Sequence, residues 1–383
     1  MSVIDKSSPI HKLKEKILKR EQENSLRTLK PENDLVDFCS NDYLGFAHSN
    51  KLAELLVDCD ILLSDTALNG STGSRLLTGN TKFTESLEQT IANYHNAEAG
   101  LIFNSGYVAN VGLFSCIGLK DDTILYDELC HASIIDGTRL SFAKAVKFKH
   151  NDTDHLKELL KKVTGTVYVA VESVYSMDGD IAPLKEISKI CEQYSANLIV
   201  DEAHATGVFG KKGDGLVCEL GLEKNVFARV HTFGKALGIH GAVVIGSKDL
   251  REYLINFSRP FIYTTALPPA NIANIKCSYA LLEKSTSILA YNKHLIHFFK
   301  EEIKEIQQLN YVNSNSCIQA IIVGDKSNTK LIAEAIQLQG YDVRPILSPT
   351  VPEGTERLRI CIHSFNTEKE IVGLIKTIKT FYK

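Results

Sequence analysis

The chain has 383 residues, of which 44% are hydrophobic and 23% charged, so it can form a sizeable core and is not disordered as a whole. Its 43 Lys and Arg against 46 Asp and Glu leave a formal charge of −3, which provides no basic field for nucleic acid or an acidic membrane surface. Nine cysteines occur without a C-x-x-C pair, which indicates free thiols in a reducing compartment. Because the first residues lack an apolar h-region and no run is long enough to span a bilayer, we expect a cytoplasmic protein.

The first predicted element is an amphipathic helix that begins at Pro9 and ends before Pro31. Its apolar positions recur at helical spacing between lysines and glutamates: Ile10, Leu13, Ile17 and Leu18. The simplest interpretation is a helix packed on the body of the protein.

Short apolar runs then alternate with longer amphipathic stretches. The runs predict strands over 100–103, 123–126, 145–148, 166–172, 197–201, 226–232 and 241–246. Helical patterns lie between several of them, notably over 154–163 and 183–194. This alternation predicts an α/β domain with a mostly parallel sheet.

The pattern changes after Pro268 and Pro269. One long helical stretch runs towards Gln308, and it is followed by three strand-like runs over 317–323, 341–347 and 358–362 and by helices over 329–339 and 367–382. We therefore predict an N-terminal helical segment over 1–45, a large domain over 46–268 and a small C-terminal α+β domain over 269–383.

A lysine directly follows the strand predicted over 226–232, in the segment VHTFGKA. Lys235 lies between Gly234 and Ala236, so little side-chain bulk surrounds it. A solvated surface lysine is the simplest interpretation. The alternative is a lysine that forms a Schiff base, as in pyridoxal phosphate enzymes, which requires a partly desolvated site that lowers the pKa.

An acidic residue ends the strand predicted over 197–201, in the segment DEAHATG. Asp201 faces a ligand site if the sheet is parallel, because ligands of open parallel sheets bind at the carboxyl ends of the strands. Three hypotheses compete for this segment. It contains the sequence Asp-Glu-Ala-His, which is typical of the DEAH box of nucleotide-driven proteins, but the chain has no G-x-x-x-x-G-K-[ST] loop to bind the phosphates of a nucleotide. Alternatively, Asp201 and His204, with His231 or His240, could hold a metal, or Asp201 could pair with the ring nitrogen of a pyridoxal phosphate bound at Lys235.

Three further segments follow predicted strands and can contribute to the same site. NSGYVAN over 104–110 opens a helical pattern whose backbone N–H groups suit a phosphate, although it could equally be a helix cap. His131 can stack on a planar cofactor or be a structural histidine. Ser176 offers a hydroxyl in the turn after the strand over 166–172. Gly70, Gly73 and Gly79 do not match G-x-G-x-x-G, so no dinucleotide fold is implied.

With these segments in this order, the sequence resembles the α-oxoamine synthases, fold-type I pyridoxal phosphate enzymes that condense an amino acid with an acyl thioester and release carbon dioxide. The resemblance covers nearly the whole chain, from about Leu26 to the C-terminus. The motifs that carry it are NDYLGF (41–46), GSTGSRLLTGN (70–80), NSGYVAN (104–110), SMDGD (176–180), DEAHATG (201–207), TFGKALG (232–238), FIYTTALPP (261–269) and PTVPEGTERLR (349–359).

The resemblance implies roles for residues near the cofactor ring. Lys235 would form the Schiff base and then remove the substrate Cα proton, and Asp201 would hold the pyridinium nitrogen. His131 would stack on the ring and contact the substrate, so it is counted with Lys235 and Asp201 as catalytic. Ser176 and His204 would hydrogen-bond the phenolic oxygen.

The same resemblance implies a phosphate site and a shared active site. The backbone N–H groups of Gly106 and Tyr107, with Thr232, would hold the phosphate. Thr264 or Thr265 would reach the phosphate of the neighbouring subunit, because the family forms its sites across a homodimer interface. No metal site is expected.

Substrate residues are implied at both ends of the chain. Arg359 would clamp the amino-acid carboxylate with the help of Asn41, since a guanidinium fork matches a carboxylate. Arg27 would suit the distal carboxylate of a pimeloyl chain, and Thr350 would contact the substrate. Within the family, the loops are most similar to the members of the biotin pathway that join L-alanine to a pimeloyl thioester, carried by coenzyme A or by a carrier protein. The alternative is a family member that joins glycine to an acetyl thioester.

Overall fold

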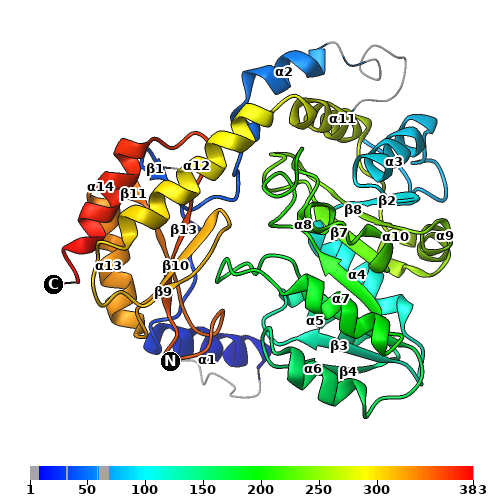
Figure 1. Cartoon of the computed structure of the whole chain (residues 1–383), viewed down its shortest axis with the longest axis horizontal. Helices are drawn as coiled ribbons and strands as arrows, with labels where there is room; N and C mark the ends of the chain where they lie inside the picture. Colours follow the sequence, from blue (N-terminus) through cyan, green and yellow to red (C-terminus); the bar gives the residue numbers. More distant parts are fainter. Residues whose placement is uncertain (1–7, 32, 58, 60–68, 383) are drawn as a thin grey trace.

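The computed structural model describes residues 8–31, 33–57, 59 and 69–382, which form two main sheets and a short strand pair surrounded by helices (Figure 1). The helices are α1 Pro9–Gln22, η1 Phe46–His48, α2 Asn50–Val57, α3 Lys82–Tyr94, α4 Gly106–Ile117, α5 Ala132–Leu140, α6 Thr153–Leu160, α7 Leu184–Gln193, α8 Leu216–Leu220, η3 Glu223–Asn225, α9 Lys248–Phe257, α10 Arg259–Ile262, α11 Pro269–Glu283, α12 Thr286–Ile303, α13 Lys326–Leu338 and α14 Glu368–Lys379. The strands are β1 Val36–Asp37, β2 Ala99–Phe103, β3 Thr123–Asp127, β4 Lys144–Phe148, β5 Val167–Glu172, β6 Asn197–Asp201, β7 Ala228–Thr232, β8 Ala242–Gly246, β9 Tyr311–Val312, β10 Ile318–Ile322, β11 Tyr341–Asp342, β12 Arg344–Ile346 and β13 Arg357–Cys361.

The large sheet has seven strands in the order β2-β8-β7-β6-β5-β3-β4. β8 runs antiparallel to both of its neighbours, whereas the remaining pairs are parallel. Every residue of β5 is buried, as expected for a central strand that helices cover on both faces. The predicted strands and the mostly parallel α/β fold are confirmed.

The carboxyl ends of the central strands place polar residues along one edge of this sheet. β3, β5 and β6 end in Asp127, Glu172 and Asp201, and the next strand in the order, β7, ends in Thr232. Glu172 and Asp201 are direct register partners. Parallel strands bring their carboxyl ends to the same edge, so residues far apart in the sequence meet there.

The C-terminal part contains a four-stranded antiparallel sheet in the order β12-β13-β10-β9. β1, from the N-terminal part of the chain, pairs with β11. Figure 1 shows this second sheet apart from the large one, with α12 passing along it. The smaller antiparallel-sheet domain is confirmed, whereas the boundaries at residues 45 and 268 stay a prediction.

The single long helix expected towards Gln308 is wrong, because the structure has two helices, α11 and α12. Between them, Ser285 occupies the N-cap position of α12, and its hydroxyl donates to the carbonyl of Leu281 at 2.7 Å. Serine and threonine favour caps over helix interiors because their side chains compete for backbone hydrogen bonds.

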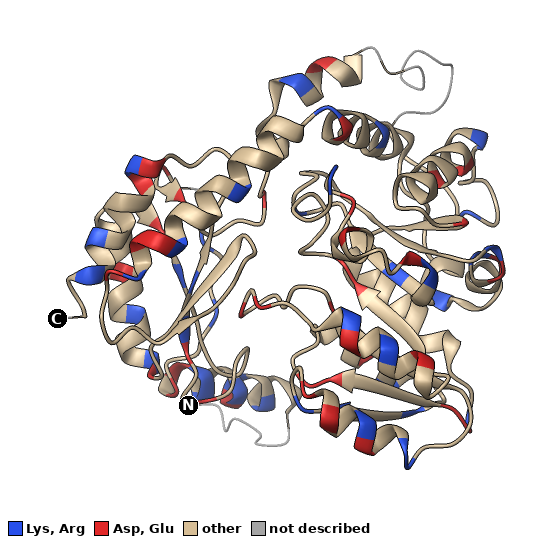
Figure 2. Ribbon diagram, in the orientation of Figure 1, with Lys and Arg blue, Asp and Glu red and all other residues tan. Residues whose placement is uncertain are grey.

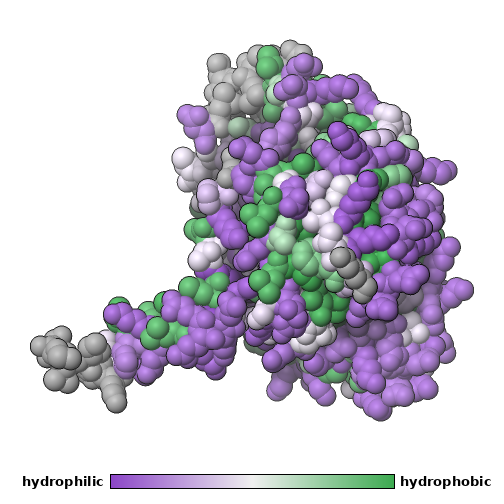
Figure 3. Space-filling model, turned by 90° about the vertical axis from the view of Figure 1, so that its left-hand side faces the viewer, coloured by the Kyte–Doolittle hydropathy of each residue, from purple (hydrophilic) through white to green (hydrophobic). Residues whose placement is uncertain are grey.

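The prediction that the first helix packs on the body is also wrong for the single chain. None of the residues of α1 is buried, and Ile10 and Leu13 are 60% and 59% exposed. Figure 3 shows hydrophobic atoms on the arm that projects from the body at the lower left, where α1 lies. The helical period identifies an apolar face but not the surface that covers it.

Figure 2 shows that positions of Lys or Arg and positions of Asp or Glu are interspersed along the outer helices. All nine cysteines are free thiols, and six of them are buried. In the described part of the chain, no helix combines the length and the apolar character that crossing a membrane requires.

Candidate active site

A chain of hydrogen bonds connects Lys235 to Arg359. Lys235 Nζ lies 2.7 Å from His204 Nε2, and His204 Nδ1 lies 2.7 Å from the hydroxyl of Tyr43. The Tyr43 hydroxyl donates to Asn41 Oδ1 at 3.1 Å, and Arg359 donates to the same oxygen at 2.9 Å. When the Tyr43 hydroxyl donates to Asn41, His204 carries its proton on Nδ1 and presents an unprotonated Nε2 to Lys235.

The surroundings of Lys235 favour its neutral amine. Lys235 lies in the turn after β7, where its burial lowers its pKa to about 8, although the carboxylates of Asp201 and Glu172 oppose this shift. Burial, together with the charges of Lys235 and Arg359, lowers the pKa of His204 well below its ordinary value. A neutral imidazole therefore faces an amine that is partly unprotonated near neutral pH, as a nucleophile or a base requires.

Asp201 and His131 are joined by a second chain of hydrogen bonds. The side-chain amide of Asn110 donates to Asp201 Oδ2 at 2.7 Å and to the hydroxyl of Ser133 at 3.0 Å. Ser133 Oγ lies 2.7 Å from His131 Nδ1, which also accepts the backbone N–H of Ser133 at 3.2 Å. A backbone N–H can only donate, so Nδ1 is the acceptor nitrogen. The exposed ring of His131 is thereby fixed beside the carboxylate at the end of β6.

Glu172 is a buried carboxyl group beside this pair. Its Oε1 accepts the backbone N–H of His131 at 2.5 Å. Burial and the neighbouring Asp201 raise the pKa of Glu172 well above its ordinary value. Glu172 therefore carries its proton more readily than a solvated glutamate does, so that the charge of Asp201 dominates at this strand end.

The start of α4 has features that suit an anion. Ser105 caps this twelve-residue helix, and the backbone N–H of Gly106 belongs to the first turn. A Cβ at Gly106 would lie 3.1 Å from Thr232 Oγ1, so the glycine keeps open the space between the helix start and β7. Helix N-termini attract anions through unpaired N–H groups and the helix dipole.

These groups together match the chemistry of pyridoxal phosphate. An amine of lowered pKa follows β7, and a carboxylate ends β6. An exposed imidazole ring follows β3, and the helix start that suits an anion follows β2. Such a cofactor needs an amine for its aldehyde, an acid for its ring nitrogen and donors for its phosphate. The hypothesis that joined Lys235 to Asp201 therefore has the geometry it needs. In the described part of the chain, no group of three His, Cys, Asp or Glu side chains is placed to hold a metal.

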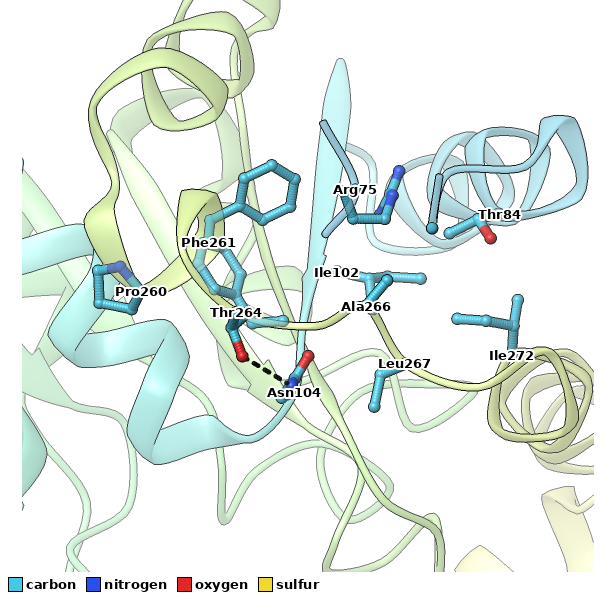
Figure 4. A pocket seen from close by; sticks show the side chains of 12 residues that line it. Arg75, Thr84, Ile102, Asn104, Pro260, Phe261, Thr264, Ala266, Leu267 and Ile272 are labelled. Atoms are coloured by element: carbon cyan, nitrogen blue, oxygen red, sulfur yellow. Dashed lines mark hydrogen bonds between the residues drawn. The ribbon is translucent and has the colours of Figure 1, made fainter. Parts of the chain in front are cut away.

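Thr264 and Thr265 lie close to the start of α4. The side-chain amide of Asn104 donates to Thr264 Oγ1 at 3.4 Å and to the carbonyl of Thr265 at 3.1 Å. Figure 4 shows Thr264 and Asn104 beside a pocket that is also lined by Arg75, Phe261 and Leu267. The pocket is also lined by Ile102 and Phe103 of β2, which precede the predicted phosphate site at the start of α4 in the sequence.

Arg359 connects the small sheet to the loop over 176–180. It is 8% exposed, and its Nε donates to the carbonyl of Ser176 at 2.7 Å. Another nitrogen of its guanidinium lies 3.0 Å from Cys361 Sγ. The predicted cofactor residue Ser176 and the predicted carboxylate clamp Arg359 are therefore direct neighbours.

The two residues implied for the distal end of the substrate meet each other. Arg27 donates to Thr350 Oγ1 at 3.1 Å. Both line a pocket with Lys330, Pro345 and Leu347 on the small domain. The sequence separates them by 323 positions, so this contact depends on the fold.

Sequence reasoning missed several polar residues that hold the predicted ones. Tyr43 and Asn110 lie within the motifs NDYLGF and NSGYVAN, but no role was inferred for them. Glu172 ends a predicted strand four residues before Ser176 of the SMDGD turn, which was the available signal. A spacing rule cannot identify such residues, because each acts through a contact with a residue far away in the sequence.

Comparison with known proteins agrees with this geometry. The family model described as "Aminotransferase class I and II" matches residues 33–378. An 8-amino-7-oxononanoate synthase of Emericella nidulans is 44% identical, with coverage of 96% of this chain and 95% of that protein. The crystal structure of the 8-amino-7-oxononanoate synthase of Francisella tularensis is 30% identical with a TM-score of 0.79, over 91% of this chain and 98% of that chain. A serine palmitoyltransferase of S. paucimobilis with bound PLP and myriocin is 25% identical with a TM-score of 0.88, over 98% of both chains.

The family model matches most of the chain, and the relatives are similar over nearly their whole length. The site also suits pyridoxal phosphate. The chain therefore belongs to the class I and II aminotransferase family and, within it, is a pyridoxal phosphate-dependent enzyme of the α-oxoamine synthases.

Proposed function

We propose that the enzyme condenses L-alanine with a pimeloyl thioester to give 8-amino-7-oxononanoate, carbon dioxide and a free thiol, a step of biotin biosynthesis. The observation that carries this proposal is the 44% identity to a protein named 8-amino-7-oxononanoate synthase over 96% of this chain. The site supports it, because an arginine clamp and a base of lowered pKa are joined through Asn41, Tyr43 and His204.

When bound, pyridoxal phosphate supplies an electron-accepting ring next to the alanine Cα. Lys235 holds its aldehyde and later removes the Cα proton, for which a pKa of about 8 is suited near neutral pH. Asp201 keeps a proton on the ring nitrogen, and the Asn110 hydrogen bond holds this carboxylate in place. His131 stacks on the ring and contacts the substrate.

The remaining cofactor residues hold the oxygen atoms of the cofactor. Gly106 and Tyr107 offer backbone N–H groups at the start of α4, and Thr232 offers its hydroxyl. Ser176 and His204 bind the phenolic oxygen. In the free enzyme His204 Nε2 lies 2.7 Å from Lys235 Nζ, and donation to the phenolic oxygen requires the tautomer that carries its proton on Nε2.

Arg359 and Asn41 orient the alanine carboxylate. Arg359 is held by Ser176 and Asn41 in the free enzyme, which presets the guanidinium for a bidentate contact. Arg27 and Thr350 bind the far carboxylate of the pimeloyl group, since their mutual hydrogen bond places a cation and a hydroxyl at one pocket.

The reaction balances without an oxidant or a reductant. Lys235 takes the Cα proton of alanine, and the new Cα–C bond forms as the C–S bond of the thioester breaks, with the thiolate taking a proton from solvent. The Cα–carboxylate bond then breaks, carbon dioxide departs, and Cα receives a proton from the protonated Lys235. Lys235 thus removes one proton and returns one in each turnover.

We further propose a cytoplasmic homodimer in which Thr264 or Thr265 reaches the cofactor phosphate of the partner subunit. The exposed apolar positions of α1 support an assembly in which a second chain covers them. The nine free thiols support a reducing compartment.

The experiment that tests the proposal offers the cofactor-loaded enzyme L-alanine, glycine or L-serine, each with pimeloyl-, acetyl-, succinyl- or palmitoyl-CoA. Thiol release and product mass are measured for every pair. We expect L-alanine with pimeloyl-CoA to be the preferred pair and to give 8-amino-7-oxononanoate. Preference for glycine with acetyl-CoA would instead make the enzyme a glycine C-acetyltransferase and overturn the substrate assignment.

If no combination of amino acid and CoA thioester gives thiol release or product, pimeloyl groups on an acyl carrier protein are offered with the same amino acids. Turnover of L-alanine with that donor keeps the proposal and identifies the carrier. Silence with both donors contradicts it.

A further inference from the structure

A charged cluster lies next to the site but contains none of the residues assigned to it above. His150, in the loop after β4, has its Nδ1 2.9 Å from Asp127 Oδ1 and its Nε2 2.8 Å from Asp180 Oδ2. Two carboxylates can both be satisfied only when both ring nitrogens donate. Burial opposes protonation of His150, but the hydrogen bonds to Asp127 and Asp180 prevail and raise its pKa to about 10. His150 is therefore an imidazolium that bridges two carboxylates.

One end of this bridge holds the segment that leads to His131. Asp127 is fully buried at the end of β3, and its Oδ1 accepts the backbone N–H of Leu129 at 2.9 Å. Its Oδ2 accepts the backbone N–H of Asn151 at 2.8 Å. Asp127 thus fixes the first turn of the 127–131 segment and the loop that carries His150.

The other end holds the 176–180 loop, which begins with Ser176. Asp180 Oδ2 accepts from His150 and from the side-chain amide of Asn151, the latter at 2.8 Å. On the opposite side this loop is bound to the small domain, where Ser314 and Ser316 donate to the carbonyl of Gly179 at 2.7 and 2.9 Å.

Two further contacts show how tightly the small domain holds the same loop. Arg357 of β13 donates to Asp178. A Cβ at Gly179 would lie 2.1 Å from the carbonyl oxygen of Ile318, so the loop rests directly on the backbone of β10. The small domain therefore sets the loop from one side, and the His150 bridge ties it to the large sheet from the other.

We propose that His150 is a positioning residue that sets the 127–131 segment and the 176–180 loop relative to each other, and so aligns His131 with Ser176 around the cofactor ring. The inference rests on the proposed function in that both residues contact the cofactor. His131 stacks on one face of the ring and Ser176 hydrogen-bonds at its edge, so both contacts require the two residues to be correctly placed relative to each other. The two residues lie in separate segments of the chain. The bridge from Asp127 through His150 to Asp180 supplies the connection.

The test compares wild type with His150→Ala and, as matched control, His155→Ala. His155 accepts the backbone N–H of Lys149 at 2.9 Å, so it holds the same loop without bridging the carboxylates. The apo-proteins are titrated with pyridoxal phosphate, and the Kd and the induced circular dichroism of the saturated protein are recorded. Neither readout needs a substrate.

For His150→Ala we expect a raised Kd, a weaker induced circular dichroism and a kcat lower by about 10²-fold, since misplacement by about 1 Å can have that effect. Added imidazole should restore the dichroism in part, because the His150 side chain is 23% exposed and its site is open to a small molecule. His155→Ala should leave these values near wild type. If His150→Ala does not fold, Asp180→Asn replaces it, with the same expected direction.

Unchanged Kd and dichroism in His150→Ala, or equal losses in His155→Ala, would overturn the proposal. Loss of unfolding free energy with normal dichroism would make the bridge structural only and also overturn it. A wild-type enzyme that binds the cofactor but does not turn over L-alanine with a pimeloyl thioester would contradict the proposed function. The same titrations would still decide the role of His150.

Discussion

Lys235 shows how the environment of a side chain, rather than its type, determines its chemistry. Its Nζ contacts the neutral imidazole of His204, and burial lowers its pKa to about 8 against the opposing effect of two nearby carboxyl groups. A lysine in water keeps its charge far above neutral pH and is a poor base there. The fold, and not the sequence neighbourhood, therefore makes this amine reactive.

Lys235→Ala should abolish turnover and covalent retention of the cofactor. Loss of a general base alone lowers rates by about 10²–10⁴-fold, and here the amine that holds the cofactor disappears as well. The measurements are kcat and the cofactor that remains on the unfolded protein after borohydride treatment. Lys189→Ala, at an exposed position of α7, should retain both. Near-normal turnover of Lys235→Ala would contradict the role given to this residue.

Glu202 is a buried carboxyl group that lies outside the reaction path. Its Oε1 accepts the backbone N–H of Val217 at 3.1 Å, whereas Oε2 has no hydrogen-bond partner among the described residues. Burial raises the pKa of Glu202 to about 7, despite the opposing charge of Arg229. Its ionised form is therefore disfavoured in the folded state, and the protonated form is favoured.

Stability should consequently depend on pH through Glu202. The pKa of Glu202 is higher in the folded than in the unfolded chain. Its contribution to the free energy of unfolding is therefore complete below the unfolded pKa, near 4.5, and is lost as the pH rises through about 7. Glu202→Gln should therefore stabilise the protein at pH 8 relative to wild type, by up to about 3 kcal/mol, and much less at pH 5. Urea unfolding of both apo-proteins at the two pH values measures this difference. The exposed Glu305→Gln should show no such pH dependence, and a constant difference for Glu202→Gln would refute the assignment.

At the scale of elements, capping determines where helices begin. Thr367 precedes α14, its hydroxyl accepts the backbone N–H of Glu370 at 3.2 Å, and the Glu370 carboxylate accepts the backbone N–H of Thr367 at 2.7 Å. This reciprocal pair satisfies two N–H groups that have no partner within the helix. The buried face of α14 then contributes Ile371, Leu374 and Ile378 to the core of the small domain.

Thr367→Ala should lower the free energy of unfolding by about 1 kcal/mol, because it removes the cap acceptor. Urea denaturation measures the loss. Ser86→Ala, at an exposed position inside α3, provides the control and should cause no loss, since alanine favours helix. Equal stability of Thr367→Ala and wild type would show that water replaces the cap.

The sequence predicted the central strands of the large sheet, which are buried nearly throughout, and it also predicted the mostly exposed edge strand β4. β5 and β6 are continuous apolar runs because helices cover both faces of the central sheet, and such runs are visible without a structure. The boundary between α11 and α12 was missed, because the helical pattern continues on both sides of Ser285. The boundary lies within the polar run over 283–287, which was included in the helical stretch because apolar helical patterns flank it on both sides.

At the scale of the molecule, α1 is the element that the single chain leaves uncovered. Its positions Ile17 and Leu18 are 49% and 52% exposed although the helix is amphipathic. Burial of one such side chain contributes about 1.5–3 kcal/mol, so a partner surface would stabilise an assembly. This is the physical support for the proposed homodimer.

We expect wild type to sediment at twice the mass of one chain and the double variant Leu13→Asp, Ile17→Asp to sediment at the mass of one chain at the same concentration. Sedimentation equilibrium measures both. Lys16→Asp, at another exposed position of α1, changes the charge but not the apolar face and should remain a dimer. A wild-type monomer would contradict the homodimer, and a dimeric double variant would place the interface elsewhere than on α1.

The amino-acid sequence by itself determined the α/β class, the strands of the large sheet, and the family through motifs spread over nearly the whole chain. These features are local, because each depends on residue type and spacing along one segment. The tertiary structure alone decided that Tyr43 joins His204 to Asn41, that Arg27 meets Thr350, and that His150 bridges Asp127 and Asp180. Such contacts join segments far apart in the chain, and their partners depend on strand order and domain placement, which a periodic pattern does not encode.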